Sequence, residues 1–160
     1  MRISLTKKNQ GFTIIEVMIV LAIAGLIMAI VFLAVPALQR SSRNTQRKTD
    51  VGSLLSSVSE YASNNSGQIP AASGTFAAEF PNNTPSLSYY ITAANVLYNY
   101  SAAARGSAPT APAGTDSVTV FNYLKCSGNA GTITNATARS IAVLFNVEGS
   151  GGVIPQCQES

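Results

Sequence analysis

The feature that most limits the possible folds of this chain is an uninterrupted apolar run near its N-terminus. From Val17 to Val35, nineteen consecutive residues carry neither a charge nor a polar side chain. At a rise of about 1.5 Å per residue, a helix of this length spans the ~30 Å hydrocarbon layer of a bilayer. The run therefore predicts a membrane-spanning helix.

The flanks of this run differ from those of a secretory signal peptide. A secretory signal has an apolar core of about 7–15 residues, followed by a cleavage site made of small residues. Here no small polar stop follows the run, whereas Gly11 and Phe12 lie just before it, after Lys7 and Lys8. Cleavage after Gly11 would leave the helix attached to the product, so the helix would be a retained part of the protein.

Glu16 lies at the start of this apolar helix. A carboxylate in such a place costs about 2–4 kcal/mol on insertion scales and is expected to find a partner. Cleavage after Gly11 would create an α-amino group on Phe12, which predicts an ion pair between Glu16 and Phe12 of a neighbouring subunit. Such a buried pair is suited to fixing the register of identical helices. The alternative is a stray carboxylate near a membrane surface; the Gly11–Phe12 junction and the basic leader favour the pair.

The segment around Gly11 resembles the processing site of type IV pilins and type II secretion pseudopilins. The resemblance rests on Gly11-Phe12-Thr13-Ile14-Ile15-Glu16-Val17 after two lysines. It implies that a membrane aspartic peptidase, the prepilin peptidase, cuts after Gly11 and N-methylates Phe12, and that Glu16 is needed for assembly. It also implies an α+β fold, in which a long N-terminal α-helix, half transmembrane and half amphipathic, packs on a small antiparallel β-sheet.

This resemblance divides the chain into four parts. Residues 1–11 are the leader peptide, residues 12–38 the transmembrane or filament-core helix, residues 39–66 the amphipathic half of the helix, and residues 67–160 a globular head with a C-terminal β-meander. Pro36 lacks a backbone donor, so we expect it to kink or locally loosen the helix.

Three arginines follow the apolar run on one helical face, because Arg40, Arg43 and Arg47 are spaced three and four residues apart. The face could contact anionic lipid head groups before assembly, or acidic residues of neighbours after it. The simpler interpretation is a solvated face. We favour it here because charged helix faces are usually solvated.

Further along the same helix, apolar residues recur at spacings of three and four. This periodicity predicts a core-facing stripe over about 120° of the helix surface. Residues 64–67 then predict the end of a helix that begins near Thr13 and ends near Asn65, with Gly67 as its cap. The stripe consists of Val51, Leu54, Leu55, Val58, Tyr61 and Ala62.

The remaining chain predicts a small antiparallel meander that covers this stripe. Its strands are expected at 117–125, at 139–147 with alternating apolar residues, and at 153–156 as an edge strand containing Pro155, after a turn at 149–152. Residues 69–85 are predicted to be a linker, residues 87–100 a short helix or an irregular segment, and residues 102–114 an exposed loop.

Cys126 and Cys157 both lie in the C-terminal third of the chain. An even number of cysteines beyond a membrane segment favours one disulfide in an oxidising compartment over two unrelated buried thiols. In the chain-entropy model such a bridge stabilises the fold by roughly 3–4 kcal/mol. The resemblance agrees, since many type IV pilins staple a C-terminal loop with one disulfide.

Composition argues against several functional classes. The chain has no histidine, which excludes imidazole catalysis and histidine metal ligands. Removing the leader would leave seven basic and seven acidic side chains, so no specific nucleic-acid binding is predicted. We find no paired carboxylates, phosphate loop or activated nucleophile, and predict neither an enzyme nor a cofactor or metal site.

The sequence thus predicts a structural subunit of a type IV pilus, used for adhesion or twitching motility. Its expected partners are copies of itself in a helical homopolymer, the prepilin peptidase, the pilus assembly platform and the membrane. It would be held in the cytoplasmic membrane as a single-pass precursor and subunit pool, and be extracellular in the assembled pilus. The alternatives are a pseudopilin of a type II secretion or DNA-uptake machine, and a signal-anchored surface binding module that never polymerises.

Overall fold

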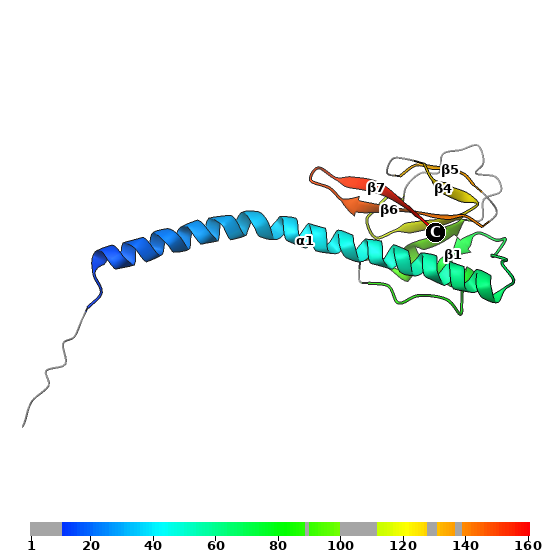
Figure 1. The fold of residues 1–160 in the computed structure, drawn as a ribbon, viewed down its shortest axis with the longest axis horizontal. Coiled ribbons are helices and arrows are strands. Elements are labelled where there is room, and N and C mark those ends of the chain that lie inside the picture. Colours follow the sequence, from blue (N-terminus) through cyan, green and yellow to red (C-terminus); the bar gives the residue numbers. More distant parts are fainter. Residues whose placement is uncertain (1–10, 89, 100–111, 128–130, 137–138) are drawn as a thin grey trace, which may run out of the picture. The chain divides into compact units, whose positions relative to one another are not determined.

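The computed structural model describes residues 11–88, 90–99, 112–127, 131–136 and 139–160. The chain divides into two compact units, an N-terminal unit (residues 1–39) and a C-terminal unit (residues 40–160), and each is described by itself. One long helix, α1 (Ile14–Asn64), contributes to both units. All other described helices and strands belong to the C-terminal unit (Figure 1).

Helix α1 begins and ends within one residue of the predicted bounds. It is helical throughout, including at Pro36, so the kink expected there stays a prediction. At its end, Gly67 has a φ of +80°, and its backbone N–H donates to the carbonyl oxygen of Ala62 at 2.7 Å. A glycine in the left-handed region that satisfies a terminal carbonyl is a common helix stop, which explains why α1 ends here.

A five-stranded sheet forms the centre of the C-terminal unit (Figure 1). Adjacent strands are antiparallel except for β2 and β3, which are parallel. The fold is therefore α+β and pilin-like, with a mostly antiparallel sheet, as predicted. In spatial order the strands are β1 (Gly74–Thr75), β2 (Val96–Asn99), β3 (Val118–Asn122), β6 (Ile141–Glu148) and β7 (Val153–Glu159).

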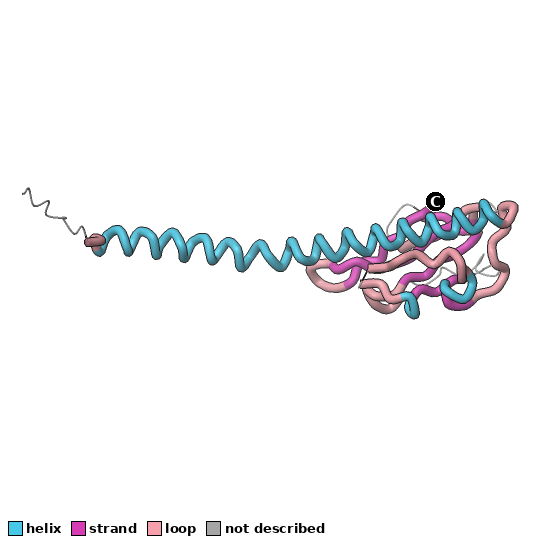
Figure 2. Tube along the Cα trace, turned by 90° about the horizontal axis from the view of Figure 1, so that it is seen from below, coloured by secondary structure: helices cyan, strands magenta, loops and turns pink. Residues whose placement is uncertain are grey.

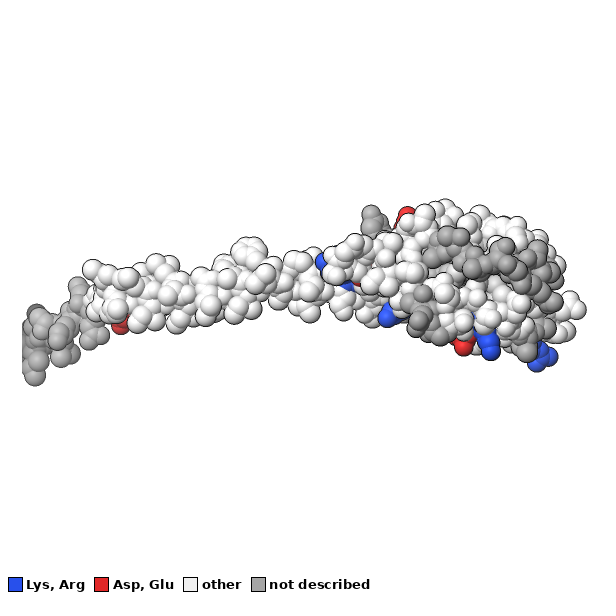
Figure 3. Space-filling view, turned by 90° about the horizontal axis from the view of Figure 1, so that it is seen from above, with Lys and Arg blue, Asp and Glu red and all other residues white. Residues whose placement is uncertain are grey.

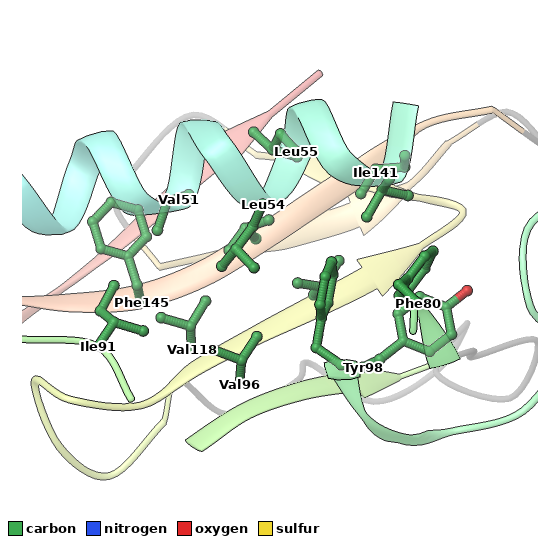
Figure 4. Close-up of a cluster of buried hydrophobic side chains, with 14 of the residues drawn as sticks. Val51, Leu54, Leu55, Phe80, Ile91, Val96, Tyr98, Val118, Ile141 and Phe145 are labelled. Carbon is green, nitrogen blue, oxygen red and sulfur yellow. The ribbon is translucent and has the colours of Figure 1, made fainter. Parts of the chain in front are cut away.

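The predicted apolar stripe of α1 covers one face of this sheet (Figures 2 and 4). Val51, Leu54, Leu55 and Val58 are each at most 6% exposed, and Tyr61 packs against their cluster from its edge. Every helical turn of the stripe thus removes apolar surface from water, which is the main stabilising contribution to this packing. The strand residues of the same cluster are Val96, Tyr98, Val118, Val120, Ile141, Val143, Phe145 and Val147.

Strand β6 is buried on both faces. The side chains that alternate from Ile141 face α1, as predicted, while Ala142 and Leu144 join a second buried cluster with Phe121 and Leu124. The cover on that side includes a separate two-stranded sheet of β4 (Leu124–Cys126) and β5 (Ile133–Asn135). A disulfide joins Cys126 of β4 to Cys157 of β7, with 5.7 Å between their Cα atoms. It is the pair predicted from the sequence, and it ties the small sheet to the large one.

The single strand predicted at 117–125 is wrong. The chain forms β3 in the large sheet and β4 in the small one, and Tyr123 lies between them with a φ of 63°. The Tyr123 N–H donates to the carbonyl oxygen of Ser140, and its own carbonyl accepts from the Ala136 N–H, both at 2.9 Å. A left-handed residue of this kind turns the chain, and its β-prone side chain concealed the turn.

Two segments predicted to lie outside the sheet contribute to the core. The segment 69–85 is not a plain linker, because it forms β1 and the short helix α2 (Phe76–Glu79), and Phe76 and Phe80 are at most 1% exposed. The segment 87–100 contains a turn of 3-10 helix, η1 (Ala93–Asn95), and then β2.

The exposed loop predicted at 102–114 lies mostly outside the described residues. The Gly149–Gly152 turn and the edge strand with Pro155 are confirmed.

The interpretation of the arginine face as solvated is wrong for two of its three members. Arg47 is 4% exposed, and Arg43 and Arg47 both donate to the Glu148 carboxylate at the end of β6. Arg43 binds it with two nitrogens, at 2.9 Å from Nε to Oε1 and 2.5 Å from Nη2 to Oε2, and Arg47 Nη2 lies 2.8 Å from Oε1. The hydrogen bonds from Arg43 and Arg47 lower the pKa of Glu148 to about 2.

This ion pair predicts an acid-sensitive contribution to stability. Because the pKa of Glu148 is lower in the folded chain than in the unfolded one, the contribution is complete above pH 4.5 and is lost as the pH falls towards 2. At pH 7 we expect Glu148→Gln to lower the free energy of unfolding by about 1 kcal/mol, since the pair is partly exposed.

The measurement is urea unfolding of the full chain in detergent micelles, followed by the near-ultraviolet circular dichroism of its tyrosines. The gap between Glu148→Gln and the wild type should close as the pH is lowered from 4.5 to 2. A gap of equal size at pH 7 and pH 2 would contradict the assignment.

Candidate functional site

The N-terminal unit presents an apolar surface that nothing in its described part covers. All described residues from Gly11 to Gln39 are exposed, and no part of the most apolar window of α1 is buried. The face of this segment drawn in Figure 3 is almost free of charged residues. By length and composition α1 could cross a membrane. An apolar surface of this size is not stable in water, so it marks a contact with lipid or with protein.

Thr13 and Glu16 close the N-terminal end of this helix. The Glu16 carboxylate oxygen Oε2 accepts hydrogen bonds from the backbone N–H and the hydroxyl of Thr13, both at 2.8 Å. In return, the Glu16 N–H donates to the Thr13 hydroxyl oxygen at 3.4 Å. The two residues form a capping box, in which each side chain satisfies a backbone donor that the helix itself leaves free.

The capping box uses only one oxygen of the carboxylate. Both donations from Thr13 end on Oε2, and in the described part of the chain no donor is found for Oε1. Phe12 is 89% exposed and shares a shallow groove with Glu16, Val17, Val20 and Leu21. The site therefore holds a carboxylate oriented by its own helix, with one oxygen open to a further donor.

The structure brings together some of the predicted site residues and separates others. Gly11, Phe12 and Glu16 lie together at the start of α1, before and within its first turn. Pro36 lies further along the same helix, and the disulfide belongs to the C-terminal unit. The cleavage, methylation and assembly roles of these residues stay predictions. Among the described residues, no group of acidic or cysteine side chains is placed to hold a metal ion.

Thr13 is the residue of this site that the sequence analysis missed. The signal was present, because a threonine followed three residues later by a glutamate, just before an apolar run, is the pattern of a capping box. The structure shows that two of the donors for this carboxylate come from the same chain.

Comparison with known proteins agrees with this geometry. Residues 6–32 match the prokaryotic N-terminal methylation motif, which is characteristic of the precursors of type IV pilins and pseudopilins. The match covers the segment before α1 and the first part of the helix, and it confirms the resemblance predicted from the sequence. It supports a precursor of the type IV pilin-like or pseudopilin kind. No curated protein and no solved structure matches the chain.

The capping box predicts a specific effect of the Thr13 hydroxyl. Thr13→Val keeps the shape of the side chain but removes the acceptor for the Glu16 N–H, which should cost about 1 kcal/mol at the helix terminus. In micelles, we expect hydrogen exchange at the amides of the first turn to rise roughly 5-fold, measured by NMR. Thr13→Ser keeps the hydroxyl and serves as the control. Equal exchange rates in the two variants would show that the hydroxyl does not cap α1.

Proposed function

We propose that this chain is the precursor of a structural subunit of a type IV pilus. It is inserted in the membrane, processed by the prepilin peptidase and polymerised into a surface filament for adhesion or twitching motility. The observation that carries the proposal is the fully exposed apolar segment of α1, which overlaps the match to the methylation motif and contains one carboxylate in the first turn of the helix.

Because the apolar segment is exposed, the same surface can contact two environments in succession, first the bilayer and then the filament. Before assembly the helix of residues 12–38 spans the bilayer, where its side chains contact lipid. In the filament the same surface packs against the helices of sister subunits. The two environments are similarly apolar, so the exchange involves little loss of hydrophobic stabilisation.

Glu16 guides this exchange through its open oxygen. Cleavage after Gly11 leaves the Thr13 N–H and hydroxyl in place, so the capping box survives processing. The new amino group on Phe12 of a neighbouring subunit then donates to Oε1, while Oε2 stays bound to Thr13. A charge pair inside an apolar bundle is stable only when both partners meet, and it therefore fixes the axial register between neighbouring helices.

The proposal assigns a role to each part of the chain. Residues 1–11 are the leader, residues 12–38 form the filament core, residues 39–66 complete the helix, and residues 67–160 form the surface of the filament. The partners are sister subunits, the prepilin peptidase and the assembly platform in the cytoplasmic membrane. The assembled product is extracellular, where the Cys126–Cys157 disulfide persists.

A pseudopilin of a type II secretion or DNA-uptake machine is the alternative, because the same N-terminal segment would serve both assemblies. The disulfide that staples the C-terminal strand favours the pilus, since a calcium-binding loop in its place would favour a secretion pseudopilin. Electron microscopy of sheared surface filaments, with mass spectrometry of their main band, distinguishes the two. A pilus subunit is expected to be that main band.

Processing predicts a definite mature N-terminus. In filaments or membranes from the native host, mass spectrometry should find a chain that begins with N-methylated Phe12. Gly11→Val should leave the uncut chain that begins at Met1, because a branched side chain fills the cleavage position. An added Cβ at Gly11 meets no other atom within 4 Å, so the change does not disturb the fold. A mature chain that lacks residues 12–38 would overturn the proposal.

The register role predicts separate effects on insertion and assembly. Glu16→Ala should leave membrane insertion intact, because it removes a costly charge from the apolar helix. The yield of sheared filaments should fall at least 10-fold. Glu60→Ala, which changes an exposed carboxylate of α1 in the C-terminal unit, is the matched control and should assemble normally. Filaments at normal yield from Glu16→Ala would show that Glu16 does not set the register.

A further inference from the structure

The stretch of α1 from Gln39 to Asp50 differs from the rest of the helix in having no apolar side chain. Only Arg47 and Asp50 of this stretch are buried, and the apolar stripe of the core begins at Val51. Apolar side chains of this stretch therefore do not hold it against the sheet. Its docking depends on polar contacts, whose net contribution per contact is modest because water competes for them.

Most of these polar contacts end on one residue, Glu148. Besides the two arginines, Asn44 binds the backbone of Glu148 with both ends of its side-chain amide. Asn44 Nδ2 donates to the Glu148 carbonyl oxygen at 2.9 Å, and the Glu148 N–H donates to Asn44 Oδ1 at 2.8 Å. The amide thus pairs with the last residue of β6 as a neighbouring peptide group would.

A second set of contacts holds the C-terminal end of the same stretch. The buried Asp50 carboxylate accepts from the Ser88 N–H at 3.0 Å and from its hydroxyl at 2.5 Å, and the Arg47 guanidinium lies 5.5 Å from the centre of the Tyr90 ring. These contacts lie next to the apolar stripe and do not involve Glu148. The contacts of Arg43 and Asn44 with the sheet, in contrast, all pass through Glu148.

We propose that Glu148 is a latch that lets the part of α1 within the C-terminal unit undock from the sheet in two stages. When the latch opens, residues 40–46, about two helical turns, leave the sheet together, because their contacts share one partner. The stripe from Val51 to Val58 stays packed. The latch is the weaker stage because the side chains of Arg43 and Glu148 are 32% and 25% exposed, so water and salt compete for this pair, whereas the Arg47 side chain is 5% exposed.

The consequence of the latch rests on the proposed function. In a filament whose core is built from residues 12–38, tension reaches the sheet of each subunit through residues 40–46 of α1. Opening the latch would lengthen the free part of each helix without exposing the apolar core. The filament could then extend under load while each subunit stays folded.

The latch itself is tested on the full chain in detergent micelles by hydrogen–deuterium exchange with mass spectrometry. In Glu148→Ala, amides of residues 41–47 should exchange at least 10-fold faster, while those of residues 51–62 should keep their wild-type rates. Asn44→Ala, which keeps the arginine pairs, should give a smaller increase in the same peptides. Glu60→Gln is the control and should leave both regions unchanged. Salt at 1 M should accelerate exchange at residues 41–47 of the wild type.

Two exchange results would overturn the latch. The first is an unchanged rate at residues 41–47 in both Glu148→Ala and Asn44→Ala. The second is equal acceleration over residues 41–62, which would mean that α1 undocks in one step. The exchange experiment needs no filaments. It therefore tests the latch even if the wild type forms no filaments and the proposed function is wrong. Where filaments form, those of Glu148→Ala should extend at a lower force in optical tweezers, and an equal force would disprove the role under load.

Discussion

The rest of this structure depends on an apolar helix surface that no described part of the chain covers. The C-terminal unit buries an apolar core between α1, the five-stranded sheet and the small sheet. The N-terminal unit buries none of its described residues. One helix therefore requires two different surroundings. The part of α1 from residue 40 onwards belongs to a unit with its own core and suits water, whereas the apolar part before residue 40 requires an apolar medium. A lipid bilayer or the apolar surface of another protein meets this requirement.

The first turn of α1 shows how a carboxylate is tolerated next to such a surface. An isolated charge in an apolar medium is costly, but the Glu16 carboxylate already accepts two hydrogen bonds from Thr13. These bonds also orient it towards the helix N-terminus, where the partial positive charge of the helix dipole is favourable. The local cap therefore lowers the cost of Glu16 without consuming its second oxygen. A carboxylate capped in this way keeps one oxygen available for a further donor.

Features that follow from local patterns were predictable from the sequence. The bounds of α1, its apolar stripe, the alternation of β6 and the hairpin at Gly149–Gly152 all depend on residues close together in the chain. Apart from the local cap by Thr13, the failures involve distant partners. Strand β2 pairs with β3 across a long connection, and Phe76 and Phe80 are buried by residues that no local pattern identifies. Gly11, Phe12 and Glu16 of the candidate site were predicted from the processing motif. Thr13 was not, because it caps the first turn of α1 and has no role in that motif.

The arginine face shows most clearly why a local rule is insufficient. Charged residues on a helix face are usually solvated, and nothing near Arg47 in sequence contradicts that expectation. Its acceptor, Glu148, is 101 residues away and becomes a neighbour only when β6 packs under α1. The same arrangement explains why a polar stretch lies between two apolar ones. Residues 40–46 carry no apolar side chain, and water can replace the hydrogen bonds that Arg43 and Asn44 make with Glu148, so this part of α1 is held less firmly than the apolar stripe that follows it.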